Sequence, residues 1–238
     1  AFEEELKNGV EAVVICNPHN PIGRVWTDGE MEHIVDLCVE YGVYLLSDEI
    51  HADFGMTRPY TTAGRFEKIH DRLVVYTAIS KTFNMAGLGS SCMMIPNPEL
   101  KQKISDSYDA CWMFGPCDLA FTAMEAAYTH GDAWVDQQLA YLEGNVETVN
   151  TFVAEHMPGV QVTKHEGTFL MWLDMTCFGK SSRELTSILA KEYGLALGDG
   201  SHYGTQAEGF MRLNIGCTRD TLIKGLEQMA VMYDKYVK

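Results

Sequence analysis

The hydrophobic pattern of the first hundred residues predicts strands that alternate with helices. Short apolar runs rich in β-branched residues predict strands at 11–16, 43–50, 73–79 and 90–96. Between the first two runs, apolar residues recur at helical spacing and stop before Gly42, which predicts a helix with Asp28 as its candidate N-cap. This alternation is typical of an α/β fold with a mostly parallel sheet. We expect the strands at 43–50 and 73–79 to be buried on both faces.

After Pro98 the pattern changes to long stretches of helical periodicity. Helices are predicted over 98–113, 119–131 and about 132–156. Beyond them, short apolar runs alternate with two more helices: strands at 160–164, 168–175, 195–200 and 210–216, and helices at 181–193 and 218–236. We therefore expect a larger domain over 1–132 and a small α+β domain over 133–238.

The composition narrows the classes of partner. The chain is 46% hydrophobic and carries a formal net charge of -15, from 33 acidic and 18 basic residues. Such a charge disfavours a nucleic-acid partner or an anionic membrane surface. No apolar run approaches the roughly 20 residues that span a bilayer. We expect small-molecule ligands, and neither nucleic acid nor membrane as partners.

The cysteines and histidines indicate no metal site. Seven cysteines are scattered along the chain without a CxxC pair, which predicts neither a disulfide framework nor a zinc site. Their number and spacing fit a reducing cytoplasm. We therefore expect a cytoplasmic protein without a metal.

Four short segments, read in order, resemble a single family. They are NPHNPIG (17–23), SDEIH (47–51), SKTFNMAGL (80–88) and FMRLNIG (210–216). Together they resemble the pyridoxal 5'-phosphate (PLP) enzymes of aminotransferase class I/II, known as fold type I. The segments DEIH and SKTFN are most similar to the cystathionine β-lyase (MalY/PatB) group. The resemblance implies PLP as cofactor, a homodimer, and the aspartate aminotransferase fold, here part of its large mainly parallel-sheet domain and its C-terminal small domain.

The resemblance gives Lys81 and Asp48 the central roles. Lys81 would hold the cofactor as a Schiff base and later remove the substrate α-proton, and Asp48 would face the pyridine nitrogen. The residues agree, because Lys81 follows a predicted buried strand and Asp48 ends another, where ligands bind in open α/β sheets. The alternatives are a surface lysine and an ordinary turn aspartate.

Further cofactor contacts follow from the same resemblance. Asn20 would donate to the cofactor's phenolic oxygen, with an ordinary Asn-Pro turn as the alternative. Ile50 would lie against one face of the ring. His51 stands where many aminotransferases have a tyrosine, so it either reaches the same oxygen or only packs. Thr77 and Ser80 are candidate phosphate contacts. The sequence departs from the related aminotransferases at 87–89, where Gly-Leu-Gly replaces a Gly-x-Arg pattern that supplies a phosphate-binding cation.

Arg212 is the candidate substrate-binding residue. It lies between apolar residues in a predicted strand, so its guanidinium requires a partner. By resemblance this partner is the α-carboxylate of an amino-acid substrate, and a structural salt bridge is the alternative. The Gly-rich segment 198–204 lacks the ending of a phosphate-binding loop, and we expect a flexible connection near the substrate entrance.

Three functions remain open at this point. The resemblance favours a carbon-sulfur β-lyase that converts a sulfur amino acid such as cystathionine or cystine to pyruvate, ammonia and a thiol. A PLP-dependent aminotransferase is the alternative. Because the first family segment lies close to residue 1, we expect the family's N-terminal part to be lacking. The third possibility is therefore a truncated, non-catalytic fragment that serves only as an assembly module.

Overall fold

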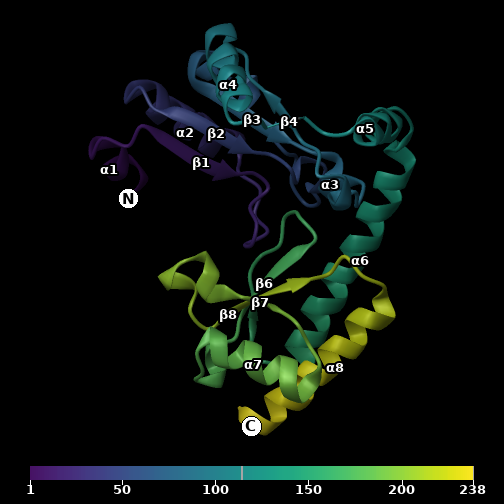
Figure 1. The fold of residues 1–238 in the computed structure, drawn as a ribbon. Helices are drawn as coiled ribbons and strands as arrows, with labels where there is room; N and C mark the ends of the chain where they lie inside the picture. Colours follow the sequence, from purple (N-terminus) through teal and green to yellow (C-terminus); the bar gives the residue numbers. More distant parts are fainter. Residues whose placement is uncertain (114, 238) are drawn as a thin grey trace. The chain divides into compact units, whose positions relative to one another are not determined.

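The computed structural model describes residues 1–113 and 115–237, and the chain divides into two compact units (Figure 1). The first unit comprises Ala1–His19 and Val25–Asp136, and the second comprises Asn20–Arg24 and Gln137–Lys238. The division falls within helix α6 (Asp132–His156). The domain boundary near residue 132 stays a prediction, because compact units of one chain are not necessarily domains that fold independently.

A four-stranded sheet forms the centre of the first unit. Its strands lie in the order β1 (Ala12–Cys16), β2 (Tyr44–Asp48), β3 (Leu73–Thr77) and β4 (Cys92–Met94). The first three strands pair in parallel, and β4 pairs antiparallel with β3. The sheet is therefore mostly parallel, as the alternation of strands and helices predicted.

The first unit also contains five α-helices among its described residues. They are α1 (Phe2–Lys7), α2 (Asp28–Glu40), α3 (Ile79–Thr82), α4 (Pro98–Ala110) and α5 (Asp118–His130). The predicted N-cap of α2 was wrong. Thr27 caps this helix in a capping box with Glu30, and Asp28 is the first helical residue. The Asp28 carboxylate instead accepts hydrogen bonds from Thr61 and Arg65.

Helix α2 covers one face of the sheet and builds the core there. Buried Val35 of α2 packs with Ile15, Leu45 and Val75 of the strands, and short 3-10 helices at Ala63–Arg65 and Glu67–Arg72 complete this layer. Every second strand residue points to this face, as strand geometry requires.

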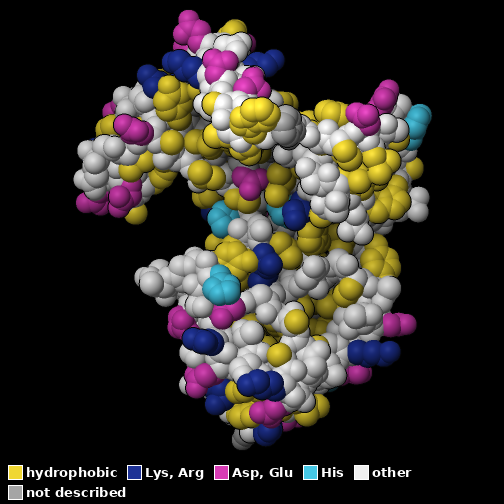
Figure 2. Space-filling view, viewed as in Figure 1, with side chains coloured by type: hydrophobic (Ala, Val, Ile, Leu, Met, Phe, Trp, Pro, Cys, Tyr) yellow, Lys and Arg dark blue, Asp and Glu magenta, His cyan; other side chains and the backbone are white. Residues whose placement is uncertain are grey.

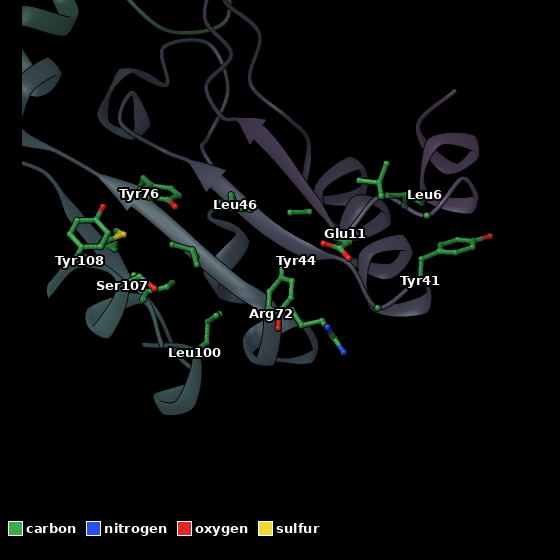
Figure 3. A pocket seen from close by; sticks show the side chains of 17 residues that line it. Leu6, Glu11, Tyr41, Tyr44, Leu46, Arg72, Tyr76, Leu100, Ser107 and Tyr108 are labelled. Carbon is green, nitrogen blue, oxygen red and sulfur yellow. The ribbon is translucent and has the colours of Figure 1, made fainter. Parts of the chain in front are cut away.

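The opposite face of the sheet is open, and we call it the open face. Val14 of β1 is 73% exposed, and Leu46 and Tyr76 are only partly buried. A groove of about 890 Å³ runs over this face, with Tyr44, Leu46 and Tyr76 in its floor (Figure 3). The expectation of burial on both faces is therefore wrong for the described strand at 43–50, whereas β3 is buried on both faces over residues 73–75.

The second unit is an antiparallel sheet with helices. Its strands lie in the order β5 (Gln161–Val162), β6 (Leu170–Asp174), β8 (Phe210–Asn214) and β7 (Gly198–Asp199). Its other helices are α7 (Ser182–Tyr193) and α8 (Arg219–Tyr236). The predicted strand at 195–200 is shorter than expected. The segment 198–204, expected to be a flexible connection, contains β7 and a 3-10 helix over Gly200–Tyr203.

A buried asparagine joins α6 to the end of β8. The Asn145 side chain is fully buried and donates to the carbonyl oxygens of Ile215, at 2.8 Å, and Cys217, at 3.1 Å. Its own oxygen accepts from Arg219 Nε at 2.6 Å. Gly144 makes room for this arginine, because a Cβ there would lie 2.5 Å from Arg219 Nη2. The chain reversal between β8 and α8 thus depends on one helix side chain.

We predict that Asn145→Ala lowers the unfolding free energy of the second unit by about 2–4 kcal/mol, because the buried carbonyl of Ile215 and the partly buried carbonyl of Cys217 lose their donor. Asn150→Ala is the matched control, since Asn150 is exposed on the same helix and should change stability by less than about 0.5 kcal/mol. Urea titration with hydrogen exchange of the β6 and β8 amides measures both. Equal stabilities of the two variants would contradict the assigned role of Asn145.

Candidate active site

Adjacent parallel strands bring six candidate residues to one edge of the first unit's sheet. Asp48 ends β2 and pairs in register with Tyr76, one residue before the end of β3 at Thr77. Lys81 lies in α3, directly after β3. The carboxyl ends of parallel strands lie at the same edge. This edge therefore carries Asp48, Ile50, His51, Thr77, Ser80 and Lys81.

Two opposite charges at this edge have no ionic partner in residues 1–113 and 115–237. Asp48 is partly buried, and its Oδ1 accepts one hydrogen bond, from the Ile50 N–H at 3.2 Å. No lysine, arginine or histidine of the described chain forms an ion pair with it. The partly buried Lys81 amine likewise has neither an ion pair nor a hydrogen bond within the described residues. Both groups are available to a ligand.

A buried carboxylate fixes the turn that follows Asp48. Glu49 is 2% exposed and accepts hydrogen bonds from Ser47 Oγ at 2.8 Å, from the Ala63 N–H at 2.9 Å and from the Tyr60 hydroxyl. Burial, and then the Glu49 carboxylate, raise the pKa of Tyr60, so this phenol stays protonated and donates. Three donors offset the cost of burying the charge and hold the backbone on either side of Asp48.

A second hydrogen bond joins the Lys81 turn to the turn after His51. Thr82 is 2% exposed, and its hydroxyl donates to Asp53 Oδ2 at 2.7 Å. Asp53 lies in a 3-10 helix over Ala52–Phe54. One residue further along the chain, the Phe83 ring stacks on Trp134 with centroids 6.0 Å apart. Contacts of Thr82 and Phe83 thus anchor the backbone that directly follows Lys81.

The remaining candidates at this edge are partly or fully buried. His51 is 1% exposed, and its ring lies 6.0 Å from that of Phe54. Ile50 and Ser80 are partly buried, and the Thr77 side chain is a hydrogen-bond partner of Tyr128. Thr77 and Ser80 bring hydroxyl groups, without a positive charge, to the edge where a phosphate was expected.

Asn20 and Arg212 come together within the second unit. Arg212 Nη1 donates to Asn20 Oδ1 at 3.0 Å across 192 positions of sequence. No carboxylate of the described residues forms an ion pair with Arg212. The structural salt bridge considered as an alternative for Arg212 is therefore absent from the described part of the chain. Because Asn20 accepts through its oxygen, its amide N–H groups stay available as donors.

The segment that carries Asn20 is held by a close backbone approach. Gly23 has a φ of +78°, and a Cβ there would lie 2.5 Å from His165 Nδ1. Its carbonyl oxygen accepts from the N–H groups of Glu166 at 2.7 Å and Gly167 at 2.9 Å. Burial lowers the pKa of His165 and favours its neutral form. Only glycine satisfies both the conformation and the space at position 23.

Sequence reasoning missed several residues that support the site. Glu49, Asp53 and Thr82 lie inside or beside the family segments SDEIH and SKTFN, so proximity to Asp48 and Lys81 was a usable signal. Tyr203 contacts Arg212 from the Gly-rich segment 198–204, where only its aromatic character offered a signal.

The described residues offer neither a metal site nor a membrane-spanning helix. They contain no group of three or more metal-ligating side chains placed to hold an ion. No helix among them has the length and apolar character needed to cross a membrane.

The chain matches known proteins in sequence and structure. The family model for aminotransferase class I and II matches residues 1–229. The chain is 38% identical over 222 residues to cystathionine beta-lyase PatB of Bacillus subtilis, a match that covers 92% of this chain and 57% of that protein. It is 32% identical to protein MalY of Escherichia coli, over 90% of this chain and 55% of that protein. The chain thus spans little more than half the length of these relatives.

A solved structure supports the same assignment. Cystalysin from Treponema denticola, whose crystal structure contains PLP, aligns with a TM-score of 0.93 at 29% identity, over 100% of this chain and 61% of that chain. This likeness confirms the expected aspartate aminotransferase fold. The matched residues, the relatives and the fold agree: the chain belongs to the aminotransferase class I and II family of PLP-dependent enzymes.

Proposed function

We propose that the protein to which this chain belongs is a PLP-dependent carbon-sulfur β-lyase that acts on sulfur amino acids such as cystathionine or cystine. The observation that carries the proposal is the pair of unpaired charges at neighbouring strand ends, Asp48 and Lys81. The relatives named cystathionine beta-lyase give the reaction type.

The donor set at the sheet edge fits PLP. A carboxylate without a cationic partner suits a protonated pyridine nitrogen, and an amine without a partner suits an aldehyde. Asp48 and Lys81 would hold the cofactor at these two points, with Ile50 and His51 beside the ring and Thr77 and Ser80 toward the phosphate. Asn20 would donate an amide N–H to the phenolic oxygen. When bound, PLP supplies an electron-accepting ring that stabilises negative charge at the substrate α-carbon.

The chain's own residues then have defined tasks. Arg212 binds the substrate α-carboxylate with the guanidinium N–H groups that Asn20 leaves unused. Lys81 Nζ takes the α-proton. In the β-lyase reaction the bond between Cβ and sulfur then breaks and the sulfur leaves as a thiol. Water hydrolyses the released three-carbon imine to pyruvate and ammonia.

An aminotransferase is the second candidate, and the family description and the relatives named aminotransferases favour it. It would use Lys81, Asp48 and Arg212 in the same way, but would require a keto acid as amine acceptor. A non-catalytic assembly module is the third, and the chain's partial span of its relatives motivates it. The availability of Asp48, Lys81 and Arg212 to ligands weighs against it for the whole protein.

We further propose that the open face is covered, in the active protein, by polypeptide equivalent to the part of the relatives that this chain does not span. The groove there is lined by large apolar side chains from β2, β3 and α4, including Leu46, Tyr76 and Tyr108. A face of this kind normally packs against another layer of an α/β domain.

The first test is a PLP titration followed by borohydride reduction and peptide mapping. We expect a reduced adduct on Lys81, either in the 238-residue chain or only after extension with the family's N-terminal part. Lys81→Ala should abolish the adduct, and Lys103→Ala, on exposed α4, should not. No adduct in either chain would refute the cofactor assignment. Pyruvate formed from cystathionine without an added keto acid would distinguish the lyase from the aminotransferase.

We predict that Thr82→Val weakens PLP binding about tenfold, because the bond to Asp53 that anchors the Lys81 turn is lost. Thr82→Ser keeps the hydroxyl and should restore binding. Thr129→Val is a matched control, since its hydroxyl bonds only within exposed α5. Absorbance titration gives the dissociation constants, and wild-type affinity of Thr82→Val would contradict the proposed link.

We also propose a cytoplasmic homodimer. All seven cysteines are free, which suits a reducing compartment. Hydrophobic side chains gather on the surface of α5 (Figure 2), where Leu119 is 67% and Phe121 55% exposed. Exposed patches of large apolar residues mark association surfaces.

Phe121→Asp should therefore convert a dimer to a monomer, because a charge would be buried at the interface. Val231→Asp is the control, since Val231 is 61% exposed on α8, a helix of the second unit. Sedimentation velocity measures both variants. A monomeric wild-type protein, or a Phe121→Asp variant that stays dimeric, would refute this surface.

A further inference from the structure

Four residues surround the guanidinium of Arg212, and we call them the arginine cradle: Asn20, Trp172, Gly198 and Tyr203. Arg212 lies on β8 and pairs with Trp172 on one side and Gly198 on the other. Directly paired residues of antiparallel strands project to the same face of the sheet. A Cβ at Gly198 would lie 3.2 Å from both Cβ and Nε of Arg212. The missing side chain at Gly198 therefore leaves the space that the arginine stem occupies.

Tyr203 covers one face of the guanidinium. Arg212 Cζ lies 5.4 Å from the centroid of the Tyr203 ring, within the range of a cation–π contact. The same ring meets Trp172 edge-on, with centroids 5.5 Å apart and planes at 85°. Trp172 is 6% exposed and stacks on Phe210 at 5.6 Å. A column of three aromatic rings thus fixes Tyr203 over the arginine.

The edge of the guanidinium makes hydrogen bonds, whereas its face contacts an aromatic ring. A guanidinium is planar, so aromatic rings contact its faces while hydrogen-bond acceptors approach its N–H groups in the plane. Asn20 Oδ1 takes one N–H of Nη1 at 3.0 Å. The charge of Arg212 is not neutralised, because Asn20 and Tyr203 are both uncharged and no carboxylate of the described residues pairs with it. The cradle thus fixes the plane of the cation and keeps its remaining N–H groups for an incoming anion.

We propose that Tyr203 is a positioning residue for carboxylate recognition, acting through its ring face, and that Gly198 is the space-making residue of the same cradle. The ligand is the α-carboxylate of an amino acid, and in this respect the inference rests on the proposed function. The Tyr203 hydroxyl has no hydrogen-bond partner among the described residues. The ring face, rather than the hydroxyl, is therefore the part that matters.

The test uses the 238-residue chain without PLP and follows modification of Arg212 by phenylglyoxal, with L-alanine as the protecting carboxylate. Peptide mass spectrometry gives the labelling rate of Arg212 at each L-alanine concentration. In Tyr203→Leu the concentration needed for half-protection should rise about tenfold, because a flat polarised ring is replaced by an aliphatic chain. Tyr203→Phe should stay within about twofold of wild type, since it keeps the ring.

Gly198→Ala provides a second, independent variant, and it should also weaken protection about tenfold by displacing the arginine stem. Its matched control is Gly225→Ala, where a Cβ would meet only Leu195 Cδ2 at an ordinary 3.6 Å. Circular dichroism verifies that each variant is folded. Wild-type protection in Tyr203→Leu, loss of protection in Tyr203→Phe, or no protection by L-alanine in the wild type would each overturn the proposal.

A steady-state assay of the active protein separates this inference from the proposed function. With cystathionine, Tyr203→Leu should raise KM about tenfold and leave kcat within about threefold, because the lost interaction acts on carboxylate binding. If the labelling results hold but no pyruvate forms, the cradle is supported and the lyase assignment fails. If pyruvate forms and labelling is unaffected in Tyr203→Leu, the lyase stands and the cradle is refuted.

Discussion

The parallel pairing of β2 with β3 is the constraint on which the first half of the site depends. The register places Asp48 opposite Tyr76, and the Glu49 N–H extends the ladder by one bond to the Tyr76 carbonyl oxygen at 2.9 Å. After this bond the strands separate and both chains turn, so Asp48 and Lys81 emerge at the same edge. A shift of one residue would turn Asp48 toward α2 and the core, where an unpaired carboxylate is costly. Strand register thus determines which side chains are available for chemistry.

Buried hydrogen bonds then convert this edge into a defined geometry. Glu49 holds the turn after β2, and the bond between Thr82 and Asp53 joins that turn to the one after β3. Each bond involves a carboxylate and a hydroxyl or backbone donor, a stronger class than bonds between neutral groups. Both oxygens of Glu49 accept hydrogen bonds from the protein, whereas Asp48 keeps one oxygen for a ligand.

The sequence predicted the parts of this arrangement that are local. Apolar runs and helical spacing identified the strands and the longer helices of both units, but not the short helices α1 and α3. Four short segments identified the fold and the candidate residues. Local pattern could not show that Thr27 rather than Asp28 caps α2, because adjacent residues of both types are good caps. The open face was missed for another reason. A hydrophobic run predicts that a strand is buried in the whole protein. It does not predict which polypeptide covers the strand, and among the described residues one face stays exposed.

Contacts between residues far apart in the sequence could not be predicted from local pattern. They determine which unit each residue of the first family segment belongs to. Asn17 is fully buried and belongs to the first unit, where it bonds to Thr61 and Trp26. Only three residues later, Asn20 belongs to the second unit, since Gly23 is bound by the 165–167 segment and Asn20 itself by Arg212.

A residue expected to bind the cofactor is thus structurally part of the element expected to bind the substrate. Asn20 and Arg212 share a hydrogen bond, so the position of the Asn20 amide is tied to the position of the Arg212 guanidinium. A change that displaces Arg212 must also release or move the Asn20 side chain, because its oxygen would lose its donor. With the proposed roles of these two residues, recognition of the substrate carboxylate and contact with the cofactor would be coupled through one bond within the second unit.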